Sequence, residues 1–284
     1  MRYNEELTAQ WGRVLWLRSE NAELAVALDF GIRIVHASYP GMENLFYEQP
    51  NDLSDGFVEK DGWRLYGGHR MWLAPESTKS YYPDNQPVSY EITDGGVLVT
   101  QPVDPWMQIQ KRLRIDFQED GSVRVEQSFE NISDAPMIGA AWGVNTLDAG
   151  GRAVVSFDGG NRGEFNPHRV VSLWADTSLH DPRLYFAKDH LVATHIPSRD
   201  YLKIGLYSNP GKAVFENKGQ RFTLTYDAQP LECYADNGCN FELYMCMQFM
   251  ELESLGVNTE ILPGQSAVHV ETWKLEPCTD VTGG

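Results

Sequence analysis

The chain has 284 residues and a formal net charge of -17, from 23 Lys and Arg against 40 Asp and Glu. A chain of this length buries about three quarters of its unfolded surface, so its core needs no disulfide or metal. The acidic balance argues against nucleic acid and against an anionic membrane as partners, because both require a basic protein face. Neutral or cationic ligands remain compatible with this charge.

The sequence also indicates where the protein works. The first residues, MRYNEELTAQW, contain no apolar core of the kind found in signal peptides. No apolar run reaches the roughly 20 residues that span a bilayer. Cys233, Cys239, Cys246 and Cys278 match no zinc-binding spacing, and three of them lie among Tyr, Phe and Met. We therefore expect a cytoplasmic protein with reduced, partly buried cysteines, no membrane segment and no disulfide.

The clearest secondary-structure signal is a β-hairpin in the middle of the chain. Apolar residues occupy nearly every second position of residues 109–117, which is the period of a strand with one buried face. Residues 118–121, Gln-Glu-Asp-Gly, supply a turn, and residues 122–129 resume the alternation. The two segments are predicted to pair as antiparallel neighbours.

Strand patterns continue along the chain, separated by Gly, Asp and Pro turn signals. No segment shows a sustained helical period, and strands do not alternate with helices. The pattern predicts an all-β protein of large antiparallel sheets, with residues 1–284 forming a single domain. Further strands are predicted at 25–35, 98–100, 153–157, 191–195, 201–207, 221–226, 241–252 and 268–275.

Two long polar segments interrupt the strand pattern, at 45–86 and 159–183, and loops of this kind often carry binding sites. The first contains Gly67-Gly68-His69-Arg70-Met71-Trp72-Leu73-Ala74-Pro75-Glu76. Trp72 could stack on the apolar face of a sugar ring, and His69 could exchange a proton near neutral pH. The alternative is a structural turn in which Arg70 and Glu76 pair with each other.

A second cluster lies at the end of an apolar run, in Phe249-Met250-Glu251-Leu252-Glu253. In a strand, Glu251 and Glu253 point to the same face. A carboxyl group in such a place either pairs with a cation or has a raised pKa, which suits a general base. The alternative is an ordinary solvated strand end.

The remaining candidates are scattered over the middle of the chain. Trp142 and Asn145 end an apolar run, whereas His168 and Trp174 lie in the second long segment. Each of these, taken alone, fits a structural role at least as well as a functional one. No pair of histidines has metal-ligand spacing with a carboxylate, and nucleotide-binding loops and the serine nucleophile elbow are absent. The sequence therefore predicts neither a metal nor a cofactor.

Several segments together resemble one protein family. In chain order they are residues 31–34, 67–76, 129–136, 250–256, 262–266 and 271–273. The ordered set is similar to the galactose mutarotase-like (aldose 1-epimerase) superfamily, and most similar to a bacterial branch of it. The resemblance covers most of the chain and implies a β-supersandwich, in agreement with the antiparallel pattern.

The resemblance also implies a reaction. Mutarotases interconvert the anomers of a free sugar without a cofactor, because a Glu takes the proton from the C1 hydroxyl while a His protonates the ring oxygen. By position, Glu251 is similar to the family's base, with Glu253 as the second choice, and His69 lies near its first substrate-binding His. The stretch 138–145, where the acid His is expected, contains none. His69 or His168 would then have to replace that acid.

Three functions remain open from the sequence. The first is an aldose 1-epimerase-like enzyme acting on a small carbohydrate, and the second is a non-catalytic sugar-binding or sensing protein. The third is a polysaccharide lyase or glycoside hydrolase, which requires Glu76 to face Glu251 across a cleft. Arg70, Arg162 and Arg169 leave a phosphosugar or a uronate open as ligand. In the first function the catalytic and sugar-contacting residues are Glu251, His69, Arg70, Trp72, Glu76, Trp142, Asn145, His168, Trp174 and Glu253.

Overall fold

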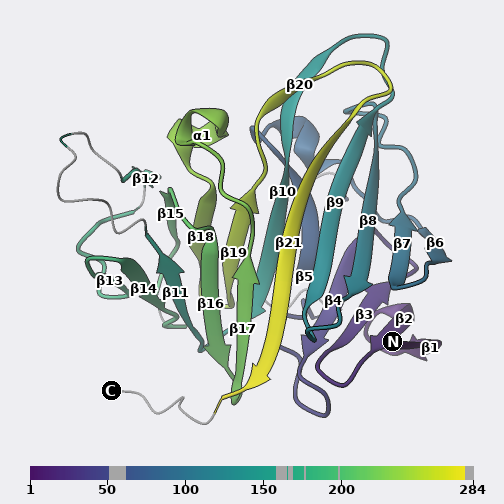
Figure 1. Cartoon of the computed structure of the whole chain (residues 1–284), viewed down its shortest axis with the longest axis horizontal. Helices are drawn as coiled ribbons and strands as arrows, with labels where there is room; N and C mark the ends of the chain where they lie inside the picture. Colours follow the sequence, from purple (N-terminus) through teal and green to yellow (C-terminus); the bar gives the residue numbers. More distant parts are fainter. Residues whose placement is uncertain (51–61, 158–164, 166–168, 176, 198, 279–284) are drawn as a thin grey trace.

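The structure is a computed structural model that describes residues 1–50, 62–157, 165, 169–175, 177–197 and 199–278. Two large antiparallel sheets pack face to face and account for most of the described chain. In Figure 1 the ten-stranded sheet runs across the front with β21 (Ser266–Pro277) near its middle, and β5 (Gly68–Ala74) and β10 (Met137–Asp148) of the eleven-stranded sheet lie behind it. The prediction of an all-β fold of large antiparallel sheets is therefore confirmed.

The eleven-stranded sheet combines the N-terminal strands with strands from the middle and the end of the chain. Its central strands are β5, β10 and β19, and β20 (Thr259–Ile261) pairs with the outer part of β10. In spatial order the strands other than β20 are β1 (Arg2–Thr8), β2 (Gly12–Arg18), β3 (Glu23–Ala27), β4 (Arg33–Ser38), β5 (Gly68–Ala74), β10 (Met137–Asp148), β19 (Phe249–Leu255), β18 (Phe241–Met245), β15 (Leu202–Leu206) and β12 (Val171–Leu173).

The ten-stranded sheet contains the predicted hairpin near one edge. In spatial order its strands are β13 (Leu184–Phe186), β14 (His190–Thr194), β11 (Arg152–Ser156), β16 (Lys212–Asn217), β17 (Gln220–Thr225), β21 (Ser266–Pro277), β9 (Val123–Asn131), β8 (Ile109–Phe117), β7 (Gly96–Thr100) and β6 (Ser89–Ile92). The helical segments of the described chain are short, namely η1 (Thr78–Tyr81), η2 (Leu231–Cys233) and α1 (Ala235–Gly238).

The main hydrophobic core lies between the sheets. Met250 and Leu252 of β19 pack in the same buried cluster as Phe215 of β16 and Trp273 of β21. Since successive side chains of a strand point to opposite faces, Glu251 and Glu253 must point away from this core. The eleven-stranded sheet therefore has a second face, which is available for a binding site.

The hairpin prediction is confirmed, and the prediction for residues 241–252 is wrong in one respect. Ile109 pairs with Asn131 and Phe117 with Val123, so β8 and β9 form the expected antiparallel pair. Residues 241–252, predicted as one strand, form β18 and β19 joined by a tight turn. The sequence gives no sign of this turn, because its residues Cys246 and Met247 continue the apolar run. Cys246 is also buried in the structure.

The segment predicted as a long loop at 45–86 contains β5, a central strand. Every residue of β5 is buried, so the strand shows no polar and apolar alternation. Gly67 and Gly68 precede and open this strand with φ values of 86° and 74°. A Cβ on Gly67 would lie 2.0 Å from the Tyr47 carbonyl oxygen, so the glycines allow a close approach of backbone rather than of a ligand.

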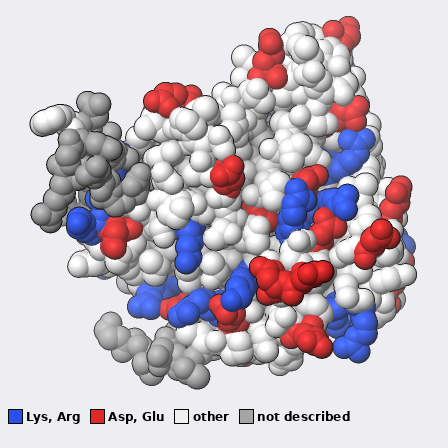
Figure 2. All heavy atoms as spheres, in the orientation of Figure 1, with Lys and Arg blue, Asp and Glu red and all other residues white. Residues whose placement is uncertain are grey.

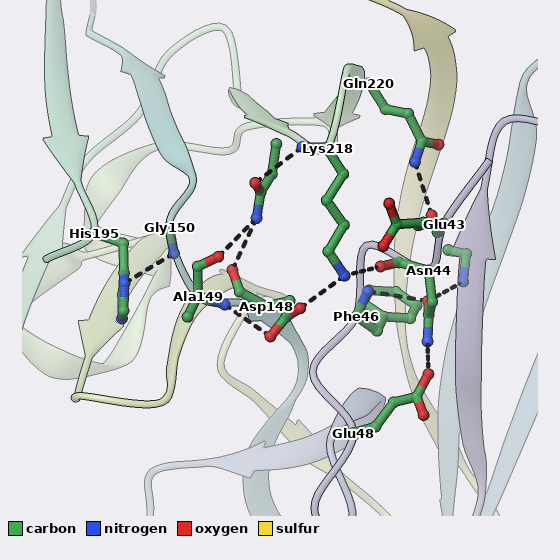
Figure 3. Close-up of polar contacts among 12 residues, drawn as sticks. Glu43, Asn44, Phe46, Glu48, Asp148, Ala149, Gly150, His195, Lys218 and Gln220 are labelled. Atoms are coloured by element: carbon green, nitrogen blue, oxygen red, sulfur yellow. Dashed lines mark hydrogen bonds and ion pairs between the residues drawn. The ribbon is translucent and has the colours of Figure 1, made fainter. Parts of the chain in front are cut away.

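A polar network joins the two sheets at one end of the sandwich (Figure 3). Lys218 and Gly219, both with positive φ, form the turn between β16 and β17. The Lys218 Nζ lies 2.7 Å from Asp148 Oδ2 at the end of β10 and donates to the Asn44 carbonyl oxygen at 2.7 Å. The Gly150 amide donates to His195 Nδ1 at 3.0 Å. These contacts hold the end of β10 against the ten-stranded sheet.

The surface carries both signs of charge. On the face shown in Figure 2, the Lys and Arg side chains are interspersed with Asp and Glu side chains. In the described part of the chain, no helix is long and apolar enough to cross a membrane. All four cysteines are free, with Cys239 and Cys246 buried and the other two partly buried.

Candidate functional site

A pocket of about 360 Å³ opens on the face of the eleven-stranded sheet that points away from the ten-stranded sheet. Its size is in the range of small-molecule sites. Strands β5, β10, β15, β18 and β19 form its floor, and residues just before and after β5 form its walls. The lining residues are Trp63, Leu65, Arg70, Trp72, Glu76, Tyr81, Trp142, Val144, Lys203, Tyr244, Phe249, Glu251 and Glu253.

A second cavity, of about 410 Å³, is slightly larger but has fewer ionisable side chains in its lining. Its ionisable lining consists of Asp227, His269 and two tyrosines. The first pocket instead gathers three carboxyl groups, a lysine, an arginine and three tryptophans. Converging polar groups in an aromatic pocket are typical of binding and catalytic sites, so we take the first pocket as the candidate site.

A compact group of charges, here called the charged floor, lies at the bottom of the pocket and directly beneath it. Glu242 of β18 and Glu253 of β19 are directly opposite each other in the antiparallel register. Lys203 of β15 places its Nζ 2.8 Å from Glu242 Oε2 and 3.4 Å from Glu253 Oε2. Burial raises the pKa of Glu242 to about 8 and also raises that of Glu253, and Glu253 adds to the effect on Glu242. The two carboxylates in turn hold the pKa of Lys203 above its ordinary value, in spite of burial.

Glu251 lies next to this group and faces the pocket. Its Oε1 accepts a hydrogen bond of 2.9 Å from the Thr146 hydroxyl, and Thr146 is its direct neighbour on β10. Burial, followed by the negative charge of Glu253, raises the pKa of Glu251 to about 8. A carboxyl group with such a pKa is partly protonated at neutral pH and can both take up and release a proton.

Aromatic rings cover the charged floor. The Trp63 and Trp72 rings meet edge to face at 6.0 Å, and the guanidinium of Arg70 lies 4.2 Å above Trp72 and 4.9 Å from Trp63. The ammonium of Lys203 lies 4.7 Å from the Trp142 ring and 5.0 Å from Trp174. Trp174 thus contacts Lys203, although it does not line the pocket.

Glu76 and Arg70 have partners of their own. Glu76 Oε1 accepts hydrogen bonds from the Tyr81 hydroxyl at 2.7 Å and from Trp72 Nε1 at 3.3 Å. Arg70 Nη2 lies 3.9 Å from Asp84, which also pairs with Arg33 at 2.9 Å. Burial and the charge of Arg33 lower the pKa of Arg70 to about 9. Arg70 and Glu76 therefore have different partners, and the alternative prediction that they pair with each other in a turn is wrong.

The structure places His69 on the opposite face of the sheet from Glu251. His69 is fully buried between the sheets, where its Nδ1 donates to Asn145 Oδ1 at 3.0 Å. Asn145 Nδ2 in turn donates to the Leu252 carbonyl at 3.2 Å and to Glu271 at 3.3 Å. Burial lowers the pKa of His69 to about 3. Because His69 and Arg70 are consecutive residues of a strand, only Arg70 reaches the pocket.

The expectation that His69 and Asn145 meet the sugar beside Glu251 therefore does not fit the structure. Both residues belong to a buried network centred on Glu271. The Ser254 hydroxyl donates to Glu271 Oε1 at 2.5 Å, and Trp273 Nε1 donates to Glu271 Oε2 at 2.8 Å. His168 lies outside the described residues, as does Arg162. Arg70, Trp72, Glu76, Trp142, Glu251 and Glu253 are brought together in one pocket.

The His69→Leu variant tests this assignment. We expect a loss of about 1–3 kcal/mol in the free energy of unfolding, because the buried Asn145 Oδ1 loses its donor. Ligand binding to the pocket should be unchanged, since His69 points to the other face. Thermal unfolding and calorimetric titration of the same sample measure both quantities. Lost binding in a variant with unchanged stability would contradict this structural role.

Sequence reasoning missed Lys203 and Glu242, which belong to the charged floor, and Thr146, which donates a hydrogen bond to Glu251. Lys203 and Glu242 each stand inside an otherwise largely apolar strand segment, and a charge in such a place was a signal that could have found them. Thr146 carries no signal of its own. Within the described ranges, no group of three or more His, Cys, Asp or Glu side chains is arranged to hold a metal ion.

The buried titratable groups predict a fall in stability on the alkaline side of neutrality. Glu242 and Glu251 have pKa values raised to about 8 and Glu271 to about 7, so the folded chain holds protons that the unfolded chain releases. Their contribution is full below the ordinary carboxyl pKa near 4.5 and is lost progressively as the pH rises from there through 7 to 8. His69 and His269, with pKa values lowered to about 3 and about 4, act in the opposite sense below the ordinary histidine pKa near 6.5.

Among the described groups with shifted pKa values, the carboxyl groups therefore dominate the slope between roughly pH 6.5 and 8. We expect the melting temperature to fall over this interval in the wild-type chain. The fall should be shallower in Glu251→Gln, which keeps the acceptor for Thr146 but cannot titrate. Scanning calorimetry at half-unit pH steps measures the slopes. Equal slopes for the two proteins would show that Glu251 titrates normally.

The two packed sheets define a protein with the galactose mutarotase-like fold, and the resemblance found in the sequence is confirmed at the level of the fold. A galactose mutarotase related enzyme from Lactobacillus acidophilus superimposes with a TM-score of 0.61 at 12% identity, covering 95% of this chain and 100% of that one. A galactose mutarotase-like protein from Lactobacillus casei gives 0.60 at 10% identity over 93% and 100%. One from Clostridium acetobutylicum gives 0.58 at 10% identity over 97% and 98%.

These identities are low, so the solved structures show a common fold and not a common activity. No protein-family model matches the chain, and neither does any curated protein. The function therefore has to be argued from the pocket itself.

Proposed function

We propose that the pocket binds a reducing sugar and that Glu251 exchanges the proton of its anomeric hydroxyl, as in an aldose 1-epimerase. The observation that carries the proposal is the placement of Glu251, a half-buried carboxyl group with a raised pKa, in a pocket with three tryptophans. Tryptophan rings suit the apolar face of a pyranose, and carboxyl groups suit its hydroxyls. Solved proteins of this fold that are named as galactose mutarotase-like add support.

The reaction needs an acid as well as a base. In ring opening, the base takes the O1 proton while C1–O1 becomes a carbonyl, and the acid protonates the ring oxygen as the C1–O5 bond breaks. Ring closure reverses these steps on either face of C1: the base returns its proton to O1, and the acid recovers its proton from O5. None of the histidines that the structure describes lines the pocket. Glu251 and Glu253 can divide the roles, because neighbouring carboxyl groups with raised pKa values need not ionise together.

The proposal is tested by binding and exchange measured together on a panel of monosaccharides. Calorimetry and tryptophan fluorescence report binding, and exchange NMR reports the rate at which the α and β anomers interconvert. The proposal requires a sugar that binds and whose anomers exchange faster in proportion to protein concentration. A panel without any binding sugar would refute it.

A non-catalytic sugar-binding protein is the second candidate, and the lack of a histidine in the lining of the pocket, as described, favours it. It predicts tight binding with an exchange rate equal to that in buffer. The same two measurements therefore distinguish it from the enzyme.

A glycoside hydrolase is kept as a third candidate because Glu76 and Glu251 line the same pocket. Hydrolases place two carboxyl groups on either side of a glycosidic bond. This function predicts the release of reducing ends from oligosaccharides, and loss of that release in both Glu76→Gln and Glu251→Gln.

A further inference from the structure

We propose that the pocket selects a sugar with a positive charge, namely a hexosamine with a free amino group, over phosphorylated and acidic sugars. This inference rests on the proposed function, since it names the class of sugar that the same pocket takes. The sequence left a phosphosugar or a uronate open because of its arginines. The arrangement of charges around the pocket points the other way.

Carboxyl groups outnumber cations in the pocket. Glu76, Glu251 and Glu253 line it against Arg70 and Lys203. Arg70 lies 3.9 Å from the buried Asp84, which is not a lining residue. Both lining cations therefore have anionic groups nearby, with which a phosphate would have to compete.

Of the two cations, Lys203 has the shorter contacts with carboxyl groups. One ammonium group faces two carboxyl groups, since Glu242 at 2.8 Å and Glu253 at 3.4 Å both reach it. Both carboxyl groups are almost fully buried. A phosphate or carboxylate of the ligand would have to compete with these two groups for a single positive charge, in surroundings where charge interactions are poorly screened.

The carboxyl groups that remain have neutral donors. Glu251 accepts from the Thr146 hydroxyl, and Glu76 accepts from the Tyr81 hydroxyl and the Trp72 indole. Glu251 is half-buried and Glu76 is exposed, and no Lys or Arg of the described chain forms an ion pair with either, so an incoming positive charge is favoured here. An amino group on the sugar supplies that charge together with hydrogen-bond donors, whereas a phosphate would add repulsion.

The aromatic walls favour the same class of ligand. The faces of tryptophan rings attract cations, and this attraction is used by binding sites for ammonium ligands. Arg70 already lies over Trp72 and Trp63, and Lys203 lies near Trp142, so these rings do hold positive charge. Tyr244 and Phe249 line the same pocket and add further rings.

A consequence is that binding of the amino sugar should release a proton. Glu251 and Glu242 are partly protonated near neutral pH, and a nearby ammonium favours their ionised forms. An anionic sugar would do the reverse and cause proton uptake. Calorimetry in two buffers with different ionisation enthalpies counts these protons directly.

The test is a matched set of ligands at pH 7: galactose, galactosamine, galacturonate and galactose 6-phosphate, together with the corresponding glucose series. For at least one series, we expect the amino sugar to bind roughly tenfold tighter than its neutral parent, and the two acidic sugars roughly tenfold weaker. Tighter binding of a phosphorylated or acidic sugar than of the neutral parent would overturn the inference.

Variants localise the effect. Glu251→Gln and Glu76→Gln should each reduce the preference for the amino sugar, and either one suffices if the other fails to fold. Glu91→Gln, the same change at an exposed position of β6, should leave the preference intact. If neutral sugars bind but the amino sugar gains nothing, this inference fails and the proposed function stands. If no sugar of any charge binds, the proposed function fails with it.

Discussion

Replacing Glu251 by Gln is expected to lower the rate of anomer exchange by roughly 10²–10⁴-fold, the contribution typical of general acid–base catalysis. The amide keeps the size of the side chain and can still accept the hydrogen bond from Thr146, but it cannot take a proton. Binding of a neutral sugar should change little, because the pocket keeps its tryptophans and its shape. Exchange NMR and calorimetry on the same preparation separate the two effects.

The control for this experiment is Glu91→Gln, which makes the same change on the exposed strand β6. Its exchange rate should equal that of the wild-type chain. Glu253→Gln distinguishes a division of labour between the two carboxyl groups, because it should lower the rate and shift the alkaline limb of the pH profile. An unchanged rate in Glu251→Gln would show that another residue is the base.

Replacing Lys203 by Met is expected to lower the free energy of unfolding by about 3–5 kcal/mol, the usual result of removing one partner from a buried ion pair. The change leaves Glu242 and Glu253 opposite each other in the sheet without a cation between them. Their mutual repulsion and burial then oppose folding most strongly at high pH, where both groups ionise. Denaturant unfolding at pH 6 and pH 8 measures the loss, which should be larger at pH 8.

A second substitution tests whether this loss comes from the carboxyl groups. In the double variant Lys203→Met with Glu242→Gln, part of the stability should return, giving a coupling energy in a double-mutant cycle. Lys274→Met is the matched control, because Lys274 pairs with Glu276 on the exposed surface. Exposed pairs contribute about 1 kcal/mol or less. A Lys203→Met variant no less stable than Lys274→Met would contradict the buried charge group.

The sequence was most informative where the side chains of a strand alternate between a buried and an exposed face. The alternation in β8 and β9 predicted their pairing, and the same period predicted that Glu251 and Glu253 share a face. Trp72 and Trp142 were predicted to contact the sugar, and the structure places them opposite each other on β5 and β10, in one pocket. The hairpin, the shared face and the common pocket could be predicted because they depend on local period and on residue chemistry, whereas contact with a sugar stays a prediction.

The prediction for His69 could not succeed, because residues 67–76 were interpreted as a loop. A loop allows neighbouring side chains to converge on one ligand, whereas a strand sends them to opposite faces. Burial on both sides of β5 had removed the alternation that identifies strands. The error in secondary structure therefore became an error in the site.

The charged floor is a product of tertiary structure. Lys203, Glu242 and Glu253 lie on three neighbouring strands, and their proximity follows from the registers of β15, β18 and β19. No local pattern states these registers. The polar network around Lys218 could not be predicted for the same reason, since it joins residues more than a hundred positions apart in the sequence.

The central claim is that Glu251 moves a proton on a sugar held in this pocket. Two-dimensional exchange NMR of a sugar that binds, at pH 7, tests it most directly. The account predicts cross-peaks between the α and β anomers that grow with wild-type protein concentration and fall to the level of buffer with Glu251→Gln. Cross-peaks of buffer intensity with the wild-type chain, or of wild-type intensity with Glu251→Gln, would contradict it.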